Sequence, residues 1–429
     1  MRRPAPSPRR ARAARLAALA CALLPLVAAS AAGAQGGTFR HETEHYRIET
    51  DISAQFTRLV GMHMEEIFKE YSRRFAEYGE VRQRFNVAVF STEEGYLSEV
   101  PPQVRGSTGV FIASKQLLAA HAEDRTPEEV LRTLYHEGFH QFMFEVVSRE
   151  APIWLNEGLA EYFSEATWNG REFELGQVPT TRLHTVQQAL RDGSYVRIGQ
   201  LLTLNPDQWL QNVRTDAHRA SLHYSESWSV VHFLIHGDNG RNASLLNDYL
   251  REIARSKPPE RAFADVFKVD AGTFERLWGA YVMSLEPSPK FRCRDNMEAL
   301  MLLAEMVYES PTEFEKVSDL RRKVLYTSGY HWEITRPTGQ KVSSQDRQQA
   351  EALFRCPFDE GRSSVSYVVV RHVPTGMPIL ICDHHPGVVL KAYYRNDSPG
   401  RRRIIVEEEV RETLDPNLAQ AIMAAVADR

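Results

Sequence analysis

Two short amphipathic segments rich in histidine and glutamate constrain this chain more than any other feature. The first, His136 to His140, reads His-Glu-Gly-Phe-His and follows Thr126-Pro127-Glu128-Glu129. A Thr cap, a Pro in the first turn and a Glu that can reach back to the cap are typical of a helix start. Residues four apart share a helix face, so the two imidazoles lie about one turn apart. Their nitrogens can then bind a single zinc ion.

The second segment, Pro152 to Phe163, has the spacing of another amphipathic helix. Glu157 and Glu161 share one face of it, where two like charges repel by a few tenths of a kcal/mol. A cation is therefore expected beside them. Zinc supplies that cation if Glu157 is a third ligand and Glu161 accepts the ring N–H of a ligating histidine. The apolar positions are expected to pack inward: Trp154, Leu159 and Phe163.

Glu137 follows the first histidine and projects beside the expected metal, where it can take a proton from water. A purely structural zinc site would not require this carboxylate, and three protein ligands leave a coordination position free. With 15 histidines in the chain, His-Glu-x-x-His also arises by chance in roughly a few per cent of such sequences. The alternative is a helix with surface histidines, and the second glutamate helix favours the metal site.

At these residues the sequence resembles the gluzincin metallopeptidases of the thermolysin-like clan, and in particular their bacterial peptidase-MA-like branch. Family members pair His-Glu-x-x-His with a Trp-Leu-x-Glu-Gly-x-Ala-x-Tyr helix, and His136 to His140 and Trp154 to Tyr162 fit both halves. The broader likeness runs from about residue 44 to residue 285. Residues 290 to 429 lie outside it.

The resemblance implies a thermolysin-like fold with Zn²⁺ bound by His136, His140 and Glu157. It implies Glu137 as general base and acid, and Glu161 as the partner of a ligating histidine. The function expected is hydrolysis of peptide bonds in a peptide or protein substrate by zinc-activated water. The alternative is a zinc-containing envelope protein that binds or supports a partner without catalysis, for which residues 290 to 429 would provide the contact surface.

The resemblance also suggests where to look for a donor to the oxyanion. Related enzymes often carry a Tyr or His in the region of His223 and Tyr224, which we expect just before a helix from Ser227 to His236. We assign Tyr224 to this role, against the alternative that it is a core or surface aromatic. The Gly-x-Met-x-Asn signature of aminopeptidases is absent, and Arg105 to Ile112 is a candidate substrate-binding edge strand. Endopeptidase action is therefore expected.

The pattern of elements predicts an α+β fold. Residues 38–125 form a small α/β layer, including a strand from Phe85 to Phe90 and a helix that Ser91 and Glu94 would open with a capping box. Residues 126–286 are mostly helical and carry the zinc ligands. Residues 290–429 form a separate α+β C-terminal domain of unknown role.

Residues 1–34 have the composition of a secretory signal peptide. An apolar run from Leu16 to Ala32 is followed by the small-x-small site Ala32-Gly33-Ala34. The chain is therefore expected in the periplasm or outside the cell, the alternative being an uncleaved signal that anchors it in a membrane. No other stretch could span a membrane.

The composition of the chain excludes several further classes of protein. The chain has 43% hydrophobic and 25% charged residues, which excludes disorder, and its net charge of −4 gives no case for nucleic-acid binding. Three cysteines remain after the signal, Cys293, Cys356 and Cys382, which allow one internal disulfide with its pairing open. The sequence leaves the oligomeric state open.

Overall fold

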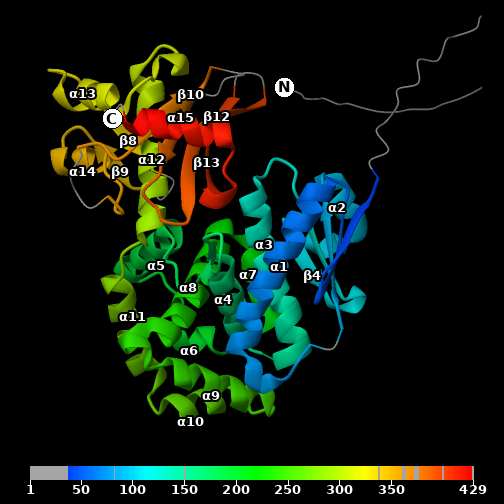
Figure 1. Cartoon of the computed structure of the whole chain (residues 1–429). Helices are drawn as coiled ribbons and strands as arrows, with labels where there is room; N and C mark the ends of the chain where they lie inside the picture. The colour runs from blue at the N-terminus through cyan, green and yellow to red at the C-terminus, as the bar shows by residue number, and fades with distance from the viewer. Residues whose placement is uncertain are drawn as a thin grey trace, which may run out of the picture. The chain divides into compact units, whose positions relative to one another are not determined.

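The computed structural model describes residues 37–81, 83–148, 151–336, 339–359, 364–371, 376–398 and 401–427 (Figure 1). The predicted signal peptide, residues 1–34, lies outside the described residues. The fold class is α+β, as predicted, with 56% of the residues in helices and 16% in strands, so that helices dominate. Among the described residues, none of the helices has both the length and the apolar character to cross a membrane.

A five-stranded sheet opens the fold, in the order β1-β2-β3-β5-β4. β2, β3 and β5 are parallel, and the antiparallel strands β1 and β4 form the two edges. Alternate residues of β5 face opposite sides: Leu118 and Ala120 join the main core, whereas Ala119 packs with Tyr96 of α2. The elements are β1 (Phe39–Glu42), β2 (Tyr46–Thr50), α1 (Ala54–Arg74), β3 (Phe85–Phe90), α2 (Glu93–Glu99), β4 (Gly109–Ile112) and β5 (Leu117–His121).

The helical part is built around α3 (Pro127–Phe142), α4 (Ile153–Ser164) and α8 (Ala217–His236). The predicted capping box of α3 is present, since Thr126 and Glu129 each accept the other's backbone N–H. α4 packs against both α3 and α8. The remaining elements are β6 (Thr167–Trp168), β7 (Phe173–Glu174), α5 (Thr180–Asp192), α6 (Ile198–Leu201), α7 (Pro206–Thr215), α9 (Ala243–Ala254), α10 (Pro259–Phe267) and α11 (Ala271–Ser284).

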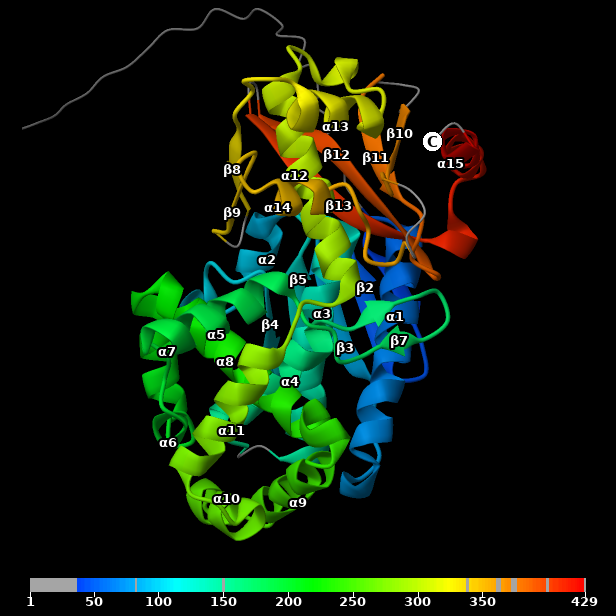
Figure 2. The ribbon, with the colours of Figure 1, turned by 90° about the vertical axis from the view of Figure 1, so that its left-hand side faces the viewer.

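The last part contains an antiparallel sheet in the order β10-β11-β12-β13 (Figure 2). Its two faces are covered by α12 and α15, because Leu380 faces the core cluster of α12 whereas Ile381 faces that of α15. The elements are α12 (Pro289–Val307), α13 (Val317–Tyr326), β8 (Glu333–Thr335), β9 (Lys341–Ser343), α14 (Arg347–Ala352), β10 (Val368–Arg371), β11 (Pro378–Cys382), β12 (Val388–Ser398), β13 (Arg401–Val410) and α15 (Pro416–Ala427). Although its apolar clusters are its own, the contacts group Thr38–Arg429 as one compact unit.

The three cysteines meet in the core of this last part. Cys293 of α12 and Cys356 form a disulfide, and the buried Cys382 of β11 places its Sγ 3.3 Å from that of Cys356. The pairing that the sequence left open is thus Cys293 with Cys356.

Two predicted helix starts are wrong. Thr92, not Ser91, caps α2 by accepting the N–H of Gly95, because the N–H and hydroxyl of Ser91 donate instead to the carboxylate of Asp51. α8 starts at Ala217, ten residues before the predicted Ser227, because the side chain of Asp216 caps it there. His223 and Tyr224 therefore lie inside this helix and not before it.

Candidate metal centre

α3 and α4 bring three ligand atoms together. Nε2 of His136 lies 3.1 Å from Nε2 of His140, and Oε2 of Glu157 lies 3.4 Å and 3.5 Å from these two nitrogens. A tetrahedral zinc ion with bonds of about 2.0–2.2 Å requires its ligand atoms to be roughly 3.3 Å apart. Oε2 of Glu157 is also buried and receives no hydrogen bond within the described chain. A bound cation would satisfy this acceptor, so the residues fit a metal ion.

The close packing of α4 on α8 fixes the position of Glu157. The next residue, Gly158, faces the backbone of α8, where an added Cβ would lie 2.4 Å from the carbonyl oxygen of Ser227. Only glycine allows this approach, because backbone atoms of a packed helix cannot move aside. Gly158 therefore sets how far Glu157 reaches toward α3.

The carboxylate of Glu157 and the two histidines stabilise one another's charged forms. Burial alone would lower the pKa of His140, but the carboxylate of Glu157 raises it, to about 9. Burial would likewise raise the pKa of Glu157, but His140 and His136 hold it well below its usual range. The site therefore keeps an ionised carboxylate in a buried position, which favours a cation.

The two histidines have different outer partners. Nδ1 of His140 lies 3.1 Å from Oδ1 of Asn156, a hydrogen bond that orients the ring. Glu161, the predicted partner, has Oε1 at 3.8 Å from Nδ1 of His136, which is beyond hydrogen-bonding distance. Its nearer partner is the guanidinium of Arg182, which contacts Oε2. Arg182 is thus the cation that compensates Glu161, where the sequence suggested zinc alone.

Glu137 is anchored to the edge strand β4. Its Oε2 accepts a hydrogen bond from the backbone N–H of Phe111 at 2.9 Å. In the part of the chain that the structure describes, Oε1 accepts none, which leaves it free for water or substrate. β4 can approach α3 this closely because residue 109 is glycine: an added Cβ would lie 2.4 Å from Cγ2 of Thr133.

Two cavities meet at the metal-binding residues. One of about 760 Å³ extends along β4 toward α7 and has apolar lining from Phe111, Phe144 and Leu210. The other, of about 500 Å³, extends past Thr108 toward Arg132. His136, Glu137 and Tyr224 line both. The candidate centre therefore lies midway along an open cleft and not at its end.

α8 turns Tyr224 and His223 in different directions, since consecutive helical residues do not share a face. Tyr224 lines the cleft, with its ring centroid 6.5 Å from that of His136. Burial, and next the carboxylate of Glu157, raise the pKa of Tyr224, so its hydroxyl stays protonated and can donate. His223 points away, with Nε2 at 3.1 Å from Nδ2 of Asn212.

The sequence prediction did not include three contributors: Asn156, Arg182 and the N–H of Phe111. Asn156 directly precedes Glu157 and could have been considered as a partner for the histidines. Arg182 follows 25 residues after Glu157 on α5, and no sequence pattern connects them. The N–H of Phe111 is a backbone group, which a side-chain motif does not indicate. A further group that could hold a metal is the cysteine cluster, two members of which form the disulfide.

A model of a protein family without an assigned activity matches part of the chain. Residues 130–260 match a family model described as "Protein of unknown function (DUF1570)". The match includes the three candidate ligands, Glu137 and Tyr224. No curated protein matches the chain.

Proposed function

We propose that the protein is a zinc-dependent metallopeptidase of the thermolysin-like, gluzincin type. The observation that carries this proposal is the cluster of His136, His140 and Glu157, whose ligand atoms are 3.1–3.5 Å apart. Two nitrogens and one carboxylate oxygen are the donor set of catalytic zinc in thermolysin-like sites. Glu137 beside this set and an open cleft on either side support a hydrolase over a structural zinc site.

Each residue of the candidate site would have its own role in the reaction. When bound, zinc polarises the substrate carbonyl and lowers the pKa of water. The free Oε1 of Glu137 takes a proton from the attacking water and later gives it to the leaving amine, while Phe111 holds Oε2. The hydroxyl of Tyr224 donates to the oxygen that gains negative charge. Asn156 keeps the ring of His140 in the orientation that binds the metal.

Endopeptidase action is the form we propose. The two cavities allow an extended chain to continue past the metal on both sides. β4 is an edge strand of the sheet. Backbone groups on its side away from β5, other than the Phe111 N–H that Glu137 binds, can align such a chain by strand addition. The proposal includes export, which rests on the leader sequence alone.

Mass-spectrometric cleavage of a diverse peptide pool tests the activity. The zinc-loaded protein is compared with its Glu137→Gln variant, which keeps the ligands and removes the base. We expect cuts within peptides by the unmodified protein and none by the variant. Equal cutting by both would show a contaminant, and no cutting by a verified zinc-loaded sample would favour the non-catalytic zinc protein.

A further inference from the structure

The first turn of α3, the helix that carries His136 and His140, is held by residues beyond 289. Glu128 lies in this turn, and Nη1 of Arg294 on α12 is 2.8 Å and 3.1 Å from its two carboxylate oxygens. The backbone N–H of Glu408 on β13 donates to Oε2 of Glu128 at 3.3 Å. Two elements of the last part thus bind one carboxylate of the metal-binding helix.

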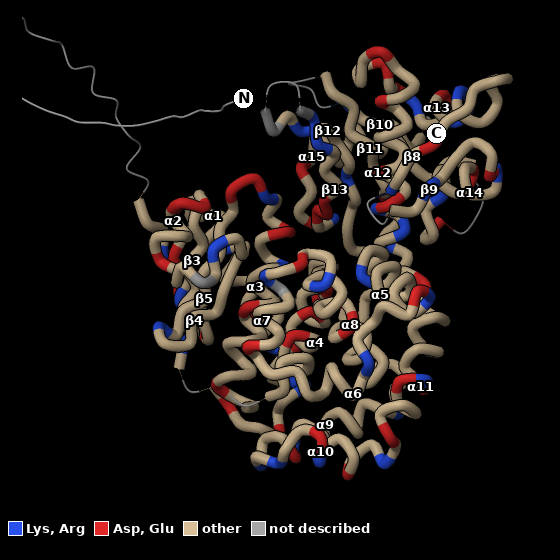
Figure 3. The backbone as a smooth tube through the Cα atoms, turned by 180° about the vertical axis from the view of Figure 1, so that it is seen from behind, with Lys and Arg blue, Asp and Glu red and all other residues tan. Residues whose placement is uncertain are grey.

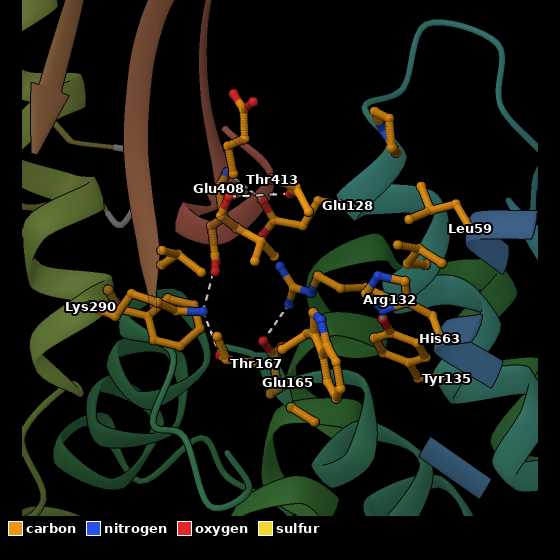
Figure 4. Close-up of a pocket in the computed structure, with 18 residues that line it drawn as sticks. Leu59, His63, Glu128, Arg132, Tyr135, Glu165, Thr167, Lys290, Glu408 and Thr413 are labelled. Atoms are coloured by element: carbon orange, nitrogen blue, oxygen red, sulfur yellow. Dashed lines mark hydrogen bonds and ion pairs between the residues drawn. The ribbon is translucent and has the colours of Figure 1, made fainter. Parts of the chain in front are cut away.

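The side chain of Glu408 continues this cluster. Its Oε1 lies 2.7 Å from Nζ of Lys290 and 3.1 Å from Nη1 of Arg294, and Lys290 also donates to Thr167 beside α4. Lys290 is only 4% exposed, so its charge is buried. Figure 4 shows Lys290, Glu408 and Glu128 around a cavity of about 270 Å³ between α3 and β13.

A second group of ion pairs lies between this cluster and the metal centre. Arg132, one turn further along α3, binds Glu165, which follows α4. Arg182 joins Glu165, at 2.7 Å, to Glu161. Glu161 in turn faces Nδ1 of His136 at 3.8 Å. Figure 3 colours the acidic and basic positions along the backbone, including those of α3, α4 and β13.

Lys290, Glu161 and Glu165 are buried, and the side chains that pair with them are partly buried, which argues for a specific role. Moving a charge out of water has a large free-energy cost, so apolar residues would join two surfaces at lower cost. A buried ion pair instead fixes relative positions, because each carboxylate has few orientations that satisfy its partners. Here the fixed positions lie at one end of the helix pair that binds the metal: Glu128 and Arg132 in the first half of α3, and Glu161 and Glu165 at the end of α4.

We propose that residues 289–427 serve to position the metal centre through two groups of ion pairs, which α3 connects. One group joins Lys290, Arg294 and Glu408 to Glu128 at the start of α3. The other joins Arg132 and Arg182 to Glu165 and Glu161. Arg182 and Glu408 are positioning residues: Arg182 fixes the carboxylate that faces His136, and Glu408 fixes the start of α3. This inference rests on the proposed zinc site but not on peptidase activity. It gives the last part of the chain a role in the site itself.

The test is zinc affinity, measured by competition with a chromophoric chelator, together with far-UV circular dichroism. Arg182→Lys keeps the charge but lacks the planar fork with which Arg182 pairs Nε with Glu165 and Nη2 with Glu161. Lys290→Gln with Glu408→Gln removes two opposite charges together at the distant end. The matched control is Lys391→Gln with Glu407→Gln, a pair 3.0 Å apart on β12 and β13 whose side chains form no ion pair with either group in the described residues.

We expect the zinc Kd to rise about tenfold or more in Arg182→Lys, the range seen when outer partners of metal ligands are removed. We expect a rise of at least about threefold in the distant double variant and no change in the control. If the distant variant unfolds, Glu128→Gln replaces it with the same expectation. Unchanged affinity in the folded Arg182 and distant variants would overturn the inference and leave the zinc site intact. Absence of zinc from the unmodified protein would instead refute the proposed function.

Discussion

Phe111 and Glu137 are joined by a hydrogen bond of 2.9 Å, from the backbone N–H of the strand residue to Oε2 of the glutamate. The bond connects the edge strand β4 to the helix that carries both histidines. It leaves one carboxylate oxygen of Glu137 for proton transfer and fixes the direction of the other. The strand proposed to align the substrate therefore also orients the proposed base.

Replacing Phe111 by proline removes this hydrogen bond selectively. The N–H points away from β5, so its loss breaks no bond of the sheet, and an edge strand tolerates proline. A hydrogen bond to a charged group contributes about 1.5–3 kcal/mol. We expect kcat to fall roughly 10- to 100-fold, with an unchanged zinc Kd. Phe111→Ala, which keeps the N–H, is the control in the same peptidase assay, and an equal fall in both variants would assign the effect to the lost ring.

Tyr224→Phe removes the proposed donor to the oxyanion and keeps the ring that packs on Trp209 at 5.4 Å. Loss of one such donor lowers kcat by about 10²–10³-fold. We expect this loss with little change in KM, zinc Kd or thermal stability. Steady-state kinetics on one defined peptide measures it. A kcat within twofold of the unmodified enzyme would remove Tyr224 from the mechanism.

Gly158→Ala should destabilise the protein by about 1–3 kcal/mol, the usual range for an atom forced into a packed core. The new Cβ would lie 2.4 Å from the carbonyl oxygen of Ser227, so α4 must move and carry Glu157 with it. The variant should therefore unfold at a lower urea concentration and bind zinc more weakly.

Gly279→Ala is the matched control for this substitution. It too lies inside a helix, but its Cβ would meet only Leu190, at 3.7 Å. A gain of about 0.5–1 kcal/mol from the lower entropy of the unfolded chain is expected there. Similar effects of the two substitutions would contradict the close packing of α4 on α8.

Glu226 on α8 makes stability depend on pH. Its side chain is fully buried, Oε1 accepts the N–H of Val196 at 2.8 Å, and burial raises its pKa from 4.5 to about 8. The folded state thus keeps a proton that the unfolded state has lost. The free energy of unfolding should therefore decrease as the pH rises from about 4.5 to about 8.

The variant Glu226→Gln isolates this contribution, because it cannot titrate. Urea unfolding at pH 5 and pH 8 should show a decrease in the unmodified protein that exceeds that of the variant by at least about 1 to 2 kcal/mol. Equal decreases would mean that the Glu226 carboxyl titrates near its ordinary pKa.

Local signals predicted much of the fold. The capping box at Thr126 and the bounds of the strand from Phe85 to Phe90 depend on residues close in sequence, and both predictions are confirmed. The start of α2 was mispredicted because Ser91 and Thr92 are both good caps, and a carboxylate 40 residues earlier decides between them. The first half of α8 was missed because it buries polar residues such as Ser225 and Glu226, which hide its inward face from hydrophobic patterning.

In the candidate site, too, local sequence patterns predicted some residues, whereas contacts between distant segments were missed. His136, Glu137 and His140 are set by helical spacing, and Glu157 by a second helix motif, so the sequence alone indicated all four. The contacts that orient them come from α5 and β4, through Arg182 and the N–H of Phe111. These contacts depend on tertiary packing between distant segments, for which one sequence carries no periodic signal.

The zinc content of the purified, reconstituted chain tests the central claim most directly. After removal of excess metal, elemental analysis should find one zinc per chain in the unmodified protein and in Glu137→Gln. It should find none retained in His136→Ala or Glu157→Ala, because each lacks one of three ligands. No stoichiometric zinc in the unmodified protein, or unchanged zinc in these two variants, would contradict the account.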